Sequence, residues 1–566
     1  MKRTTLALLV LLCSSASAQF TEVLEVRVTN VDVIVTKGGQ PVSGLTRDDF
    51  EIYENGVKKE ISNFLEIQEA SPSATLTTTG TPAETTTPAV VPPPSPRPRS
   101  ITIFVDNTIL SPARRNQVLP HLKKFLAEQV RPGDLVAVVV WGAGMKVMLD
   151  PTSDATRIAQ AVEQLGKWAV VNSDLRGDRE QFYESVESLI HLWSSKKVAL
   201  PNGEIVQAKP KWSEGLSLAR AYADKVLFDA RARGEALKSV IATQRAMPGR
   251  KIFVLLTQNM STNPAEEAFL YLDSRRDEFD QVTAPAVVMA REFELPSLVT
   301  EIARTANSAG VAIYPIDGGG KDSNTPFAPD ASEGRSLATR GQFAVADTST
   351  GTLMGIAADT GGVASVGSTN FALAFDTIAN DLNTYYSLGY RSEGERTDRL
   401  NRIEVKLKKR GYQVRTRNSV VEQSVASEMQ DAVTANLFAP SATNELGVRV
   451  AAGAATPRDA ESVTIPLTLT IPTDRLALLP DGTDVVGKFA VHAAFLRGDG
   501  AVSKVARQEY PLRFTAESLP RRKEITVKID VAADPKVGAI SVGVMDQTTR
   551  ATGFASVSLT PPSSAP

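Results

Sequence analysis

Histidine and cysteine, which most often serve as general base, nucleophile or metal ligand at neutral pH, are scarce in this chain. The three histidines, His121, His191 and His492, lie in separate segments, and no pair has the spacing of a metal site. The only cysteine, Cys13, lies near the N-terminus. We therefore interpret the histidines as ordinary surface or half-buried residues, and expect no reactive thiolate in the mature chain.

Sequence motifs of the common catalytic sites are also absent. The chain has no Gly-x-Ser-x-Gly elbow, no His-Glu-x-x-His helix and no phosphate-binding Walker loop. Gly318–Gly320 follows an apolar strand, but the polar residues after it do not open a helix, so we interpret it as a turn. The carboxylates between Glu163 and Glu180 are interpreted as a solvated surface. We therefore expect no enzymatic activity.

The first 18 residues have the pattern of a cleavable signal peptide. Lys2 and Arg3 precede the apolar run Leu6–Leu12, and Ala16-Ser17-Ala18 supplies small residues for cleavage. The run is shorter than the roughly 20 residues that span a bilayer, and no later stretch is long and apolar enough. We expect a secreted or periplasmic protein without a transmembrane segment; an uncleaved N-terminal anchor is the alternative.

Length and charge narrow the remaining classes. A chain of 566 residues exceeds one hydrophobic core and is expected to form several domains. The formal net charge of −2 gives no electrostatic reason to expect nucleic acid as a partner. Composition and periodicity predict five segments: a signal peptide at 1–18, an N-terminal β-rich unit at 19–68, a Pro/Thr/Ser-rich linker at 69–99, an α/β domain at 100–420 and a C-terminal β-sandwich at 440–560.

Apolar runs alternate with helical patterns in the α/β segment. Ile101–Val105, Leu135–Trp141 and Ile252–Leu256 are nearly continuous apolar strands, which predicts a doubly wound, mostly parallel sheet covered on both faces. The stretch at about 167–249 is longer than such a domain needs, and we interpret it as a helical insertion. Because carboxyl ends of parallel strands meet at one edge, Asp106 and Thr257 are expected on a common rim.

Period-2 patterns predict strands on both sides of this domain. Val31, Val33 and Val35 alternate with polar residues, after a phase slip near Thr29 that leaves a β-bulge and a strand break both open. Alternation in Val463–Ile471 and regular turn spacing beyond it predict the C-terminal β-sandwich.

Five short strings, in order, resemble landmarks of one family. They are Pro41-Val-Ser-Gly-Leu-Thr-Arg-Asp-Asp-Phe50, Pro248-Gly-Arg-Lys251, Ile313-Tyr-Pro-Ile-Asp317, Asp359-Thr-Gly-Gly362 and Tyr385-Tyr-Ser-Leu-Gly-Tyr390. The chain resembles the acidobacterial VWFA-related domain family, a divergent branch of von Willebrand factor A-like (VWA-like) domains in exported bacterial proteins. The resemblance covers roughly residues 22–417, and it implies a VWA-like α/β fold.

The resemblance also implies where a metal would bind. VWA domains hold Mg²⁺ at the strand ends, through an Asp-x-Ser-x-Ser loop and a later Asp, in a metal-ion-dependent adhesion site. Asp106 and Thr108 match the loop, but Leu110 replaces its second hydroxyl, and Thr257-Gln258 stands where relatives carry Thr-Asp. We expect a degenerate site with no cofactor; Mg²⁺ is the ion that the resemblance would bring, with Asp106 and Thr108 as its candidate ligands.

These expectations combine into one hypothesis and two rivals. We expect a secreted, non-catalytic binding or adhesion protein whose VWA-like domain contacts a protein or cell-surface partner. The first rival is a structural envelope component that has lost ligand binding. The second is a hydrolase in which the helical insertion forms a lid over the strand ends. The oligomeric state and the identity of the partner do not follow from the sequence.

Overall fold

The computed structural model describes most of the chain. The described residues are 27–68, 99–108, 110, 112–142, 144–168, 175–247, 249–258, 260–318, 349–392, 398–437, 444–459, 462–497, 502–515, 517–518 and 523–559. The predicted signal peptide, and the predicted linker apart from Arg99, lie outside these residues. Within them, no helix combines the length and the apolar character needed to cross a membrane.

A five-stranded sheet forms the centre of the α/β unit. Its strand order is β12-β11-β6-β7-β8, and every neighbouring pair is parallel except β7 with β8. The strands are β6 (Arg99–Asp106), β7 (Leu135–Trp141), β8 (Met145–Thr152), β11 (Arg250–Thr257) and β12 (Val311–Asp317). Numbered along the sheet the order is 3-2-1-4-5, with a switch in direction between β6 and β11. Doubly wound sheets place ligands at such a switch, beyond the carboxyl ends of the strands.

Helices cover both faces of this sheet, as the apolar strands predict. One face packs against α1 (Pro112–Gln129), α2 (Ala155–Lys167) and α8 (Phe371–Asn383). The other packs against α6 (Leu298–Ala309), the helix at 349–360 and the C-terminal part of α4 (Trp212–Thr243). Every residue of β6 is buried, because its alternate side chains enter two different cores. This double burial fixes the positions of the strand ends.

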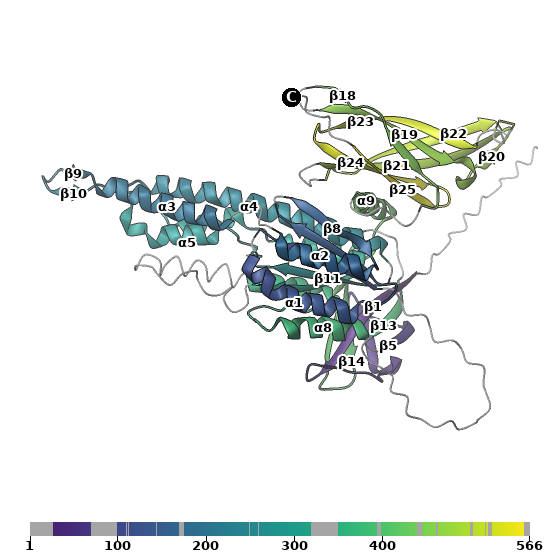
Figure 1. Ribbon diagram of the computed structural model, residues 1–566, viewed down its shortest axis with the longest axis horizontal. Helices are drawn as coiled ribbons and strands as arrows, with labels where there is room; N and C mark the ends of the chain where they lie inside the picture. Colours follow the sequence, from purple (N-terminus) through teal and green to yellow (C-terminus); the bar gives the residue numbers. More distant parts are fainter. Residues whose placement is uncertain are drawn as a thin grey trace, which may run out of the picture.

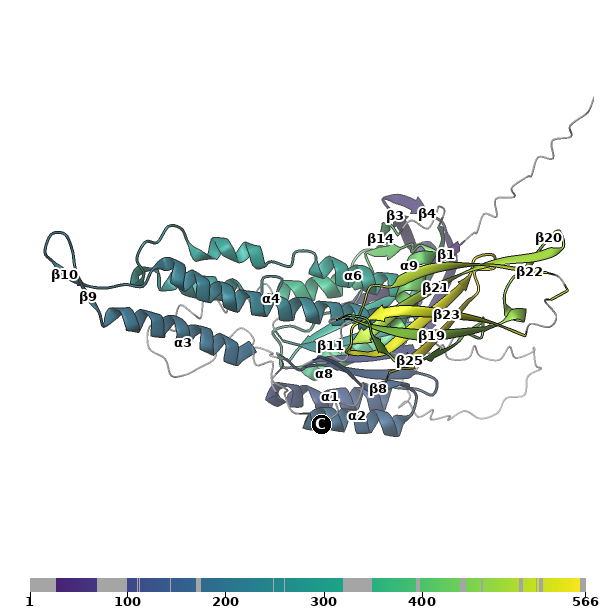
Figure 2. The same cartoon turned by 90° about the horizontal axis from the view of Figure 1, so that it is seen from above.

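A helical arm extends from the α/β unit and has a core of its own. It contains α3 (Leu175–Ser194), the N-terminal part of α4, α5 (Glu266–Ser274) and a 3₁₀ segment, η4 (Ala286–Phe293). The hairpin of β9 (Lys197–Ala199) and β10 (Ile205–Gln207) forms the end of the arm in both views (Figures 1 and 2). The arm therefore contains the described part of the predicted insertion at about 167–249 except the C-terminal part of α4, together with residues beyond the insertion.

The N-terminal β-rich unit also contains strands that follow the α/β unit in the sequence. One sheet has the order β15-β1-β13-β5 and the other β16-β14-β3-β4, with one apolar core between them. The strands are β1 (Arg27–Lys37), β3 (Phe50–Glu54), β4 (Val57–Lys59), β5 (Ile61–Gln68), β13 (Thr384–Ser392), β14 (Leu400–Leu407), β15 (Gln413–Thr416) and β16 (Ser419–Val421). The predicted boundaries assign the last four strands to the α/β domain, because local periodicity does not reveal which sheet a strand joins.

The C-terminal segment forms two antiparallel sheets around one core. Strands β17, β18, β19 and β23 make the first sheet, and β20, β21, β22, β24 and β25 make the second. Their bounds are β17 (Arg449–Ala452), β18 (Thr456–Pro457), β19 (Val463–Pro472), β20 (Leu479–Asp481), β21 (Asp484–Arg497), β22 (Ala506–Thr515), β23 (Glu524–Ala533), β24 (Val537–Asp546) and β25 (Thr552–Ser558). Helix α9 (Val425–Ala435) packs on the second sheet and contacts α4, joining the sandwich to the α/β unit.

Candidate functional site at the strand ends

Two neighbouring strands bring polar side chains together at the switch point. Asp106 ends β6 and Thr257 ends β11, and the two strands are paired in parallel. The hydroxyl of Thr257 donates a hydrogen bond to Oδ2 of Asp106 over 3.0 Å. The structure thus places both residues on the common rim that parallel pairing predicts, although they are 151 positions apart in the sequence.

The loop after β6 folds back on the same carboxylate. The hydroxyl of Thr108 donates to Oδ1 of Asp106 over 2.6 Å, and its backbone N–H donates to the same oxygen over 3.2 Å. An aspartate that accepts from the residue two positions later is a common way to stabilise a tight turn. Asp106 therefore accepts three hydrogen bonds from its own rim, and both carboxylate oxygens are occupied.

An arginine of α4 supplies the counter-charge. Nη1 of Arg233, on α4, lies 3.5 Å from Oδ2 of Asp106 and 3.5 Å from Oδ2 of Asp229. The Arg233 side chain is 4% exposed and that of Asp106 is 1% exposed, so solvent barely screens this pair. Burial raises the pKa of Asp229 against the attraction of Arg233, and the charges of Asp106 and Asp178 raise it further.

A second buried arginine fixes the loop from the other side. Arg115, on α1, donates to Oδ1 of Asn107 over 2.6 Å and to the backbone carbonyls of Gly166 and Trp168. Only 1% of Arg115 is exposed, and this burial lowers the pKa of its guanidinium. The loop between β6 and α1 is thus tied to α1 and α2 by hydrogen bonds that need no ligand.

The residues present do not fit a Mg²⁺ site. Leu110 is 1% exposed and packs in the core, where a Cβ built on Gly318 would lie 2.3 Å from its Cδ1. Gln258 brings no negative charge to the position where VWA domains carry their second carboxylate. No three His, Cys, Asp or Glu side chains gather closely enough to hold a metal in the part of the chain that the structure describes. Mg²⁺ needs several hard oxygen ligands to offset its dehydration.

The rim is also inaccessible. Asp106 and Thr257 are 0% exposed, and Thr108 and Gln258 are each 8% exposed. A partner therefore cannot contact these side chains directly in this arrangement. The sequence pattern finds the aspartate and both threonines but misses Arg115 and Arg233.

Those two arginines nevertheless leave a signal in the sequence. Arg233 follows Ala230 by three positions and precedes Leu237 by four, so it falls on the apolar stripe of its helix. Arg115 likewise precedes Val118 and Leu119 on the buried face of α1. A charged residue in the middle of a buried stripe requires a specific partner. The histidines were predicted to be surface or half-buried residues. His191 is exposed and His121 is half-buried, as predicted, but His492 is 1% exposed, so the prediction is wrong for His492.

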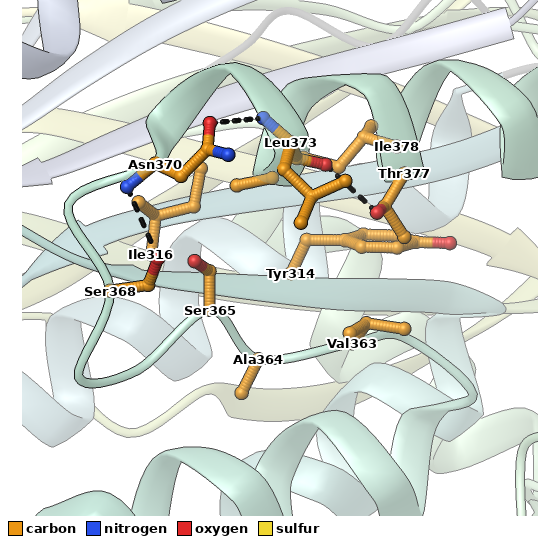
Figure 3. Close-up of a pocket in the computed structure, with 11 residues that line it drawn as sticks. Tyr314, Ile316, Val363, Ala364, Ser365, Ser368, Asn370, Leu373, Thr377 and Ile378 are labelled. Carbon is orange, nitrogen blue, oxygen red and sulfur yellow. Dashed lines mark hydrogen bonds between the residues drawn. The ribbon is translucent and has the colours of Figure 1, made fainter. Parts of the chain in front are cut away.

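A cavity of about 170 Å³ lies at the β12 edge of the sheet (Figure 3). Apolar side chains from β12, from Val363 and Ala364 and from α8 form most of its lining, and two of its polar side chains form hydrogen bonds within the first turns of α8. Asn370 accepts from the N–H of Leu373, and the hydroxyl of Thr377 donates to the carbonyl of Leu373. Small-molecule sites usually have about 300–1,000 Å³, so this cavity is too small for a typical ligand.

The end of the helical arm exposes apolar side chains. On the β9–β10 hairpin and its turn, Val198 is 48% exposed, Leu200 39% and Ile205 67%. Exposed lysines flank the hairpin at positions 196, 197, 209 and 211. Acidic residues of the adjoining segment lie near the last two: Lys209 donates to the carbonyl of Asp277, and the Trp212 N–H to that of Asp280.

Comparisons with known proteins give little beyond this geometry. No family model matches the chain, and no curated protein matches it. Among solved structures, an aerotolerance-related membrane protein from Bacteroides fragilis is 10% identical, with 50% of this chain and 98% of that chain covered and a TM-score of 0.19. BatB from Bacteroides thetaiotaomicron is 8% identical (50% and 97% covered, TM-score 0.20). The vWF domain of the pili tip protein Mfa5 from Porphyromonas gingivalis is 11% identical (51% and 95%, TM-score 0.20). Superpositions this poor support no conclusion about function.

Proposed function

We propose that this chain is an exported, non-catalytic binding protein that contacts a protein or cell-surface partner through its helical arm. The observation that carries the proposal is the apolar hairpin at the end of the arm, combined with the burial of the strand-end rim. Export is proposed from the pattern of residues 1–18, and it places the arm in the periplasm or outside the cell.

The exposed hairpin has the chemistry of a contact surface. Val198 and Val206 are directly opposite each other on one face, while Ala199 and Ile205 pair on the other. An isolated two-stranded hairpin in water is marginally stable, so apolar side chains on both of its faces favour coverage by another molecule. The flanking lysines favour a partner surface that is apolar at its centre and acidic at its edge.

The contact between α4 and the strand ends supports binding over hydrolysis. Helix α4 reaches the strand ends through Arg233. In the described residues, this contact is the Asp106–Arg233 ion pair rather than a nucleophile with its base. No turnover is proposed.

We also propose that the α/β unit is a divergent VWA domain of the acidobacterial VWFA-related kind. The 3-2-1-4-5 strand order, the antiparallel edge strand β8 and the position of Asp106 at the end of the first strand support this assignment. The landmark strings of the sequence also have defined roles in the fold. Tyr386 and Tyr390 of β13, for instance, are 0% exposed in the core of the N-terminal β unit.

Binding through the arm is tested with one double variant and one matched control. Val198→Asp/Ile205→Asp places charges on both faces of the hairpin, and Val57→Asp/Leu479→Asp changes two apolar residues of similar exposure on other units (61% and 53%). The immobilised mature chain should capture a saturable partner from the envelope fraction of its source. We expect the hairpin variant to lose at least tenfold in retention, while the control retains it.

The result is decisive in both directions if melting temperatures are measured alongside. The hairpin variant should melt with the wild type, because its substituted side chains pack against no core. Undiminished retention by the folded hairpin variant would refute binding through the arm. Equal loss in both double variants would show a general effect of surface charge and would also refute it.

A further inference from the structure

We infer that Arg233 occupies the role of a bound cation at the strand ends, so that this chain carries its own permanent counter-charge for Asp106. The inference concerns the α/β unit and is independent of what the arm binds. If Arg233 does not have this role, binding through the arm can still be correct. If the arm binds no partner, the role of Arg233 can still be correct.

A buried carboxylate requires compensation. Asp106 is 0% exposed, and an ionised group removed from water is stable only when it is paired and hydrogen-bonded. The hydroxyls of Thr108 and Thr257 supply hydrogen bonds, but they supply no charge. Arg233 is the basic side chain that the described residues place within salt-bridge distance of Asp106.

The position of the guanidinium resembles that of a bridging ion. It lies at 3.5 Å from a carboxylate oxygen of Asp106 and at the same distance from one of Asp229. These two carboxylates come from different elements, the strand β6 and the helix α4, so the guanidinium connects the sheet rim to α4. A divalent cation bound at the same place would face electrostatic repulsion from this fixed positive charge.

Helix packing holds this cation in place. Arg233 lies within α4, where Leu237, Val240 and Ile241 of the following turns pack in the core on one sheet face. In the same core, a Cβ built on Gly234 would lie 2.6 Å from Cδ1 of Leu298 on α6, so α4 and α6 approach closely at this level. Unlike a metal ion, the guanidinium cannot dissociate or be removed by a chelator.

The consequence is a strand-end site that is independent of metal and closed. Neither Mg²⁺ nor Ca²⁺ should change the stability of the α/β unit, and contact with a partner should not require a divalent ion. This behaviour is opposite to that expected of a metal-dependent adhesion site, although Asp106 and Thr108 match the start of such a loop.

The experiment is a double-substitution cycle on the mature full-length chain, followed by calorimetry. Wild type should melt within about 1 °C in millimolar MgCl₂, CaCl₂ or EDTA, because no ion is bound or lost. Arg233→Met should lower the melting temperature of the α/β unit by about 6–12 °C, because a buried charge is left unpaired. Asp106→Asn in the Arg233→Met background should restore more than half of that loss.

A matched control separates a specific pair from general damage to a buried arginine. Arg99 and Asp134 form a buried ion pair at the opposite end of β6, with side chains 2% and 3% exposed. Arg99→Met should also lower the melting temperature, but Asp106→Asn should not restore it. If Arg233→Met alone cannot be isolated while the double variant folds, the same conclusion follows.

Two results would overturn the inference. The first is a wild-type melting temperature that rises by several degrees with Mg²⁺ or Ca²⁺, or falls by as much with EDTA. The second is additivity of Asp106→Asn and Arg233→Met, which would show that the two side chains do not stabilise each other. If neither the single nor the double variant folds, the response of the wild type to metal and chelator still decides between a metal-independent and a metal-dependent site at the strand ends.

Discussion

Replacing Gly362 by alanine should destabilise the α/β unit strongly, although it adds only one methyl group. Gly362 follows the helix at 349–360, and its N–H donates to the carbonyl of Ala357 where that helix ends. A Cβ at this position would lie 1.9 Å from the carbonyl oxygen of Ile313, in the middle of β12. The neighbouring Thr360 accepts a hydrogen bond from the N–H of Ile313, so the turn is held against the strand.

The size of the effect follows from that distance. Real Cβ atoms essentially never approach another heavy atom within 3.0 Å, so the turn and β12 must separate by more than 1 Å. Neither side of the contact is a flexible side chain. Overpacking of a rigid core costs about 1–3 kcal/mol, and a backbone clash belongs at or above the upper end. A loss of about 3 kcal/mol lowers the melting temperature of a domain of this size by about 6–12 °C.

Gly351 provides the matched control, because it lies in the same helix and a Cβ added there would have no atom within 4 Å. Gly351→Ala should stabilise the helix by about 0.5–1 kcal/mol. Calorimetry of both variants gives the shifts, and hydrogen exchange of peptides from β12 identifies the transition of the α/β unit. A Gly362→Ala protein that melts within about 2 °C of wild type would refute the reasoning.

Three further substitutions test other parts of the structure. Burial, followed by the charges of Arg245 and Arg417, lowers the pKa of Lys251 to about 8. Between pH 8 and 10.5 this lysine is mostly neutral in the folded protein but still protonated in the unfolded chain. The free energy of unfolding of the wild type should therefore rise as the pH increases from about 8 towards 10.5. Lys251→Met should remove that rise in denaturant titrations. His492 is 1% exposed, and burial, then Arg507, lowers its pKa. Stability of the sandwich should thus fall as the pH drops below about 6.5, and His492→Leu should abolish this dependence in melts between pH 5 and 7. Leu110→Ser restores the loop's second hydroxyl, but calorimetry should show a loss of about 2–4 kcal/mol and no response to Mg²⁺.

Strands and helices were predictable where burial imposes a period on the sequence. Asn55 and Gly56 both have positive φ, 51° and 82°, in the turn between β3 and β4, as a type I′ hairpin requires. The phase slip near Thr29 has a simpler origin than a bulge or a break. Strand β1 is continuous through this position and pairs with β13 without a register shift. Val28 is simply an exposed apolar residue, with 42% of its surface accessible. A single exposed valine imitates a change of phase, because periodicity assumes that every apolar residue is buried.

Pairing between distant strands was not predictable from such patterns. Strand β1 pairs with β13, so Val31 lies opposite Leu388, although more than half of the sequence separates the two residues. Alternation shows that each strand has a buried face but not which partner covers it. The apolar pattern therefore separates residues 19–68 from 384–421, whereas in the structure the strands of 27–68 form one unit with β13, β14, β15 and β16.

The strand-end site shows the same limit at the level of single residues. Parallel topology is enough to bring Asp106 and Thr257 to one rim, because strand ends are fixed by the sheet. The charge that completes the site comes instead from Arg233, within an insertion whose direction no local pattern specifies. An arginine on an apolar helical stripe signals a buried partner, but several carboxylates could have met it. The position of α4 in the fold determines that Arg233 pairs with Asp106. As a result, a loop whose sequence resembles an open metal site forms a buried ion pair instead.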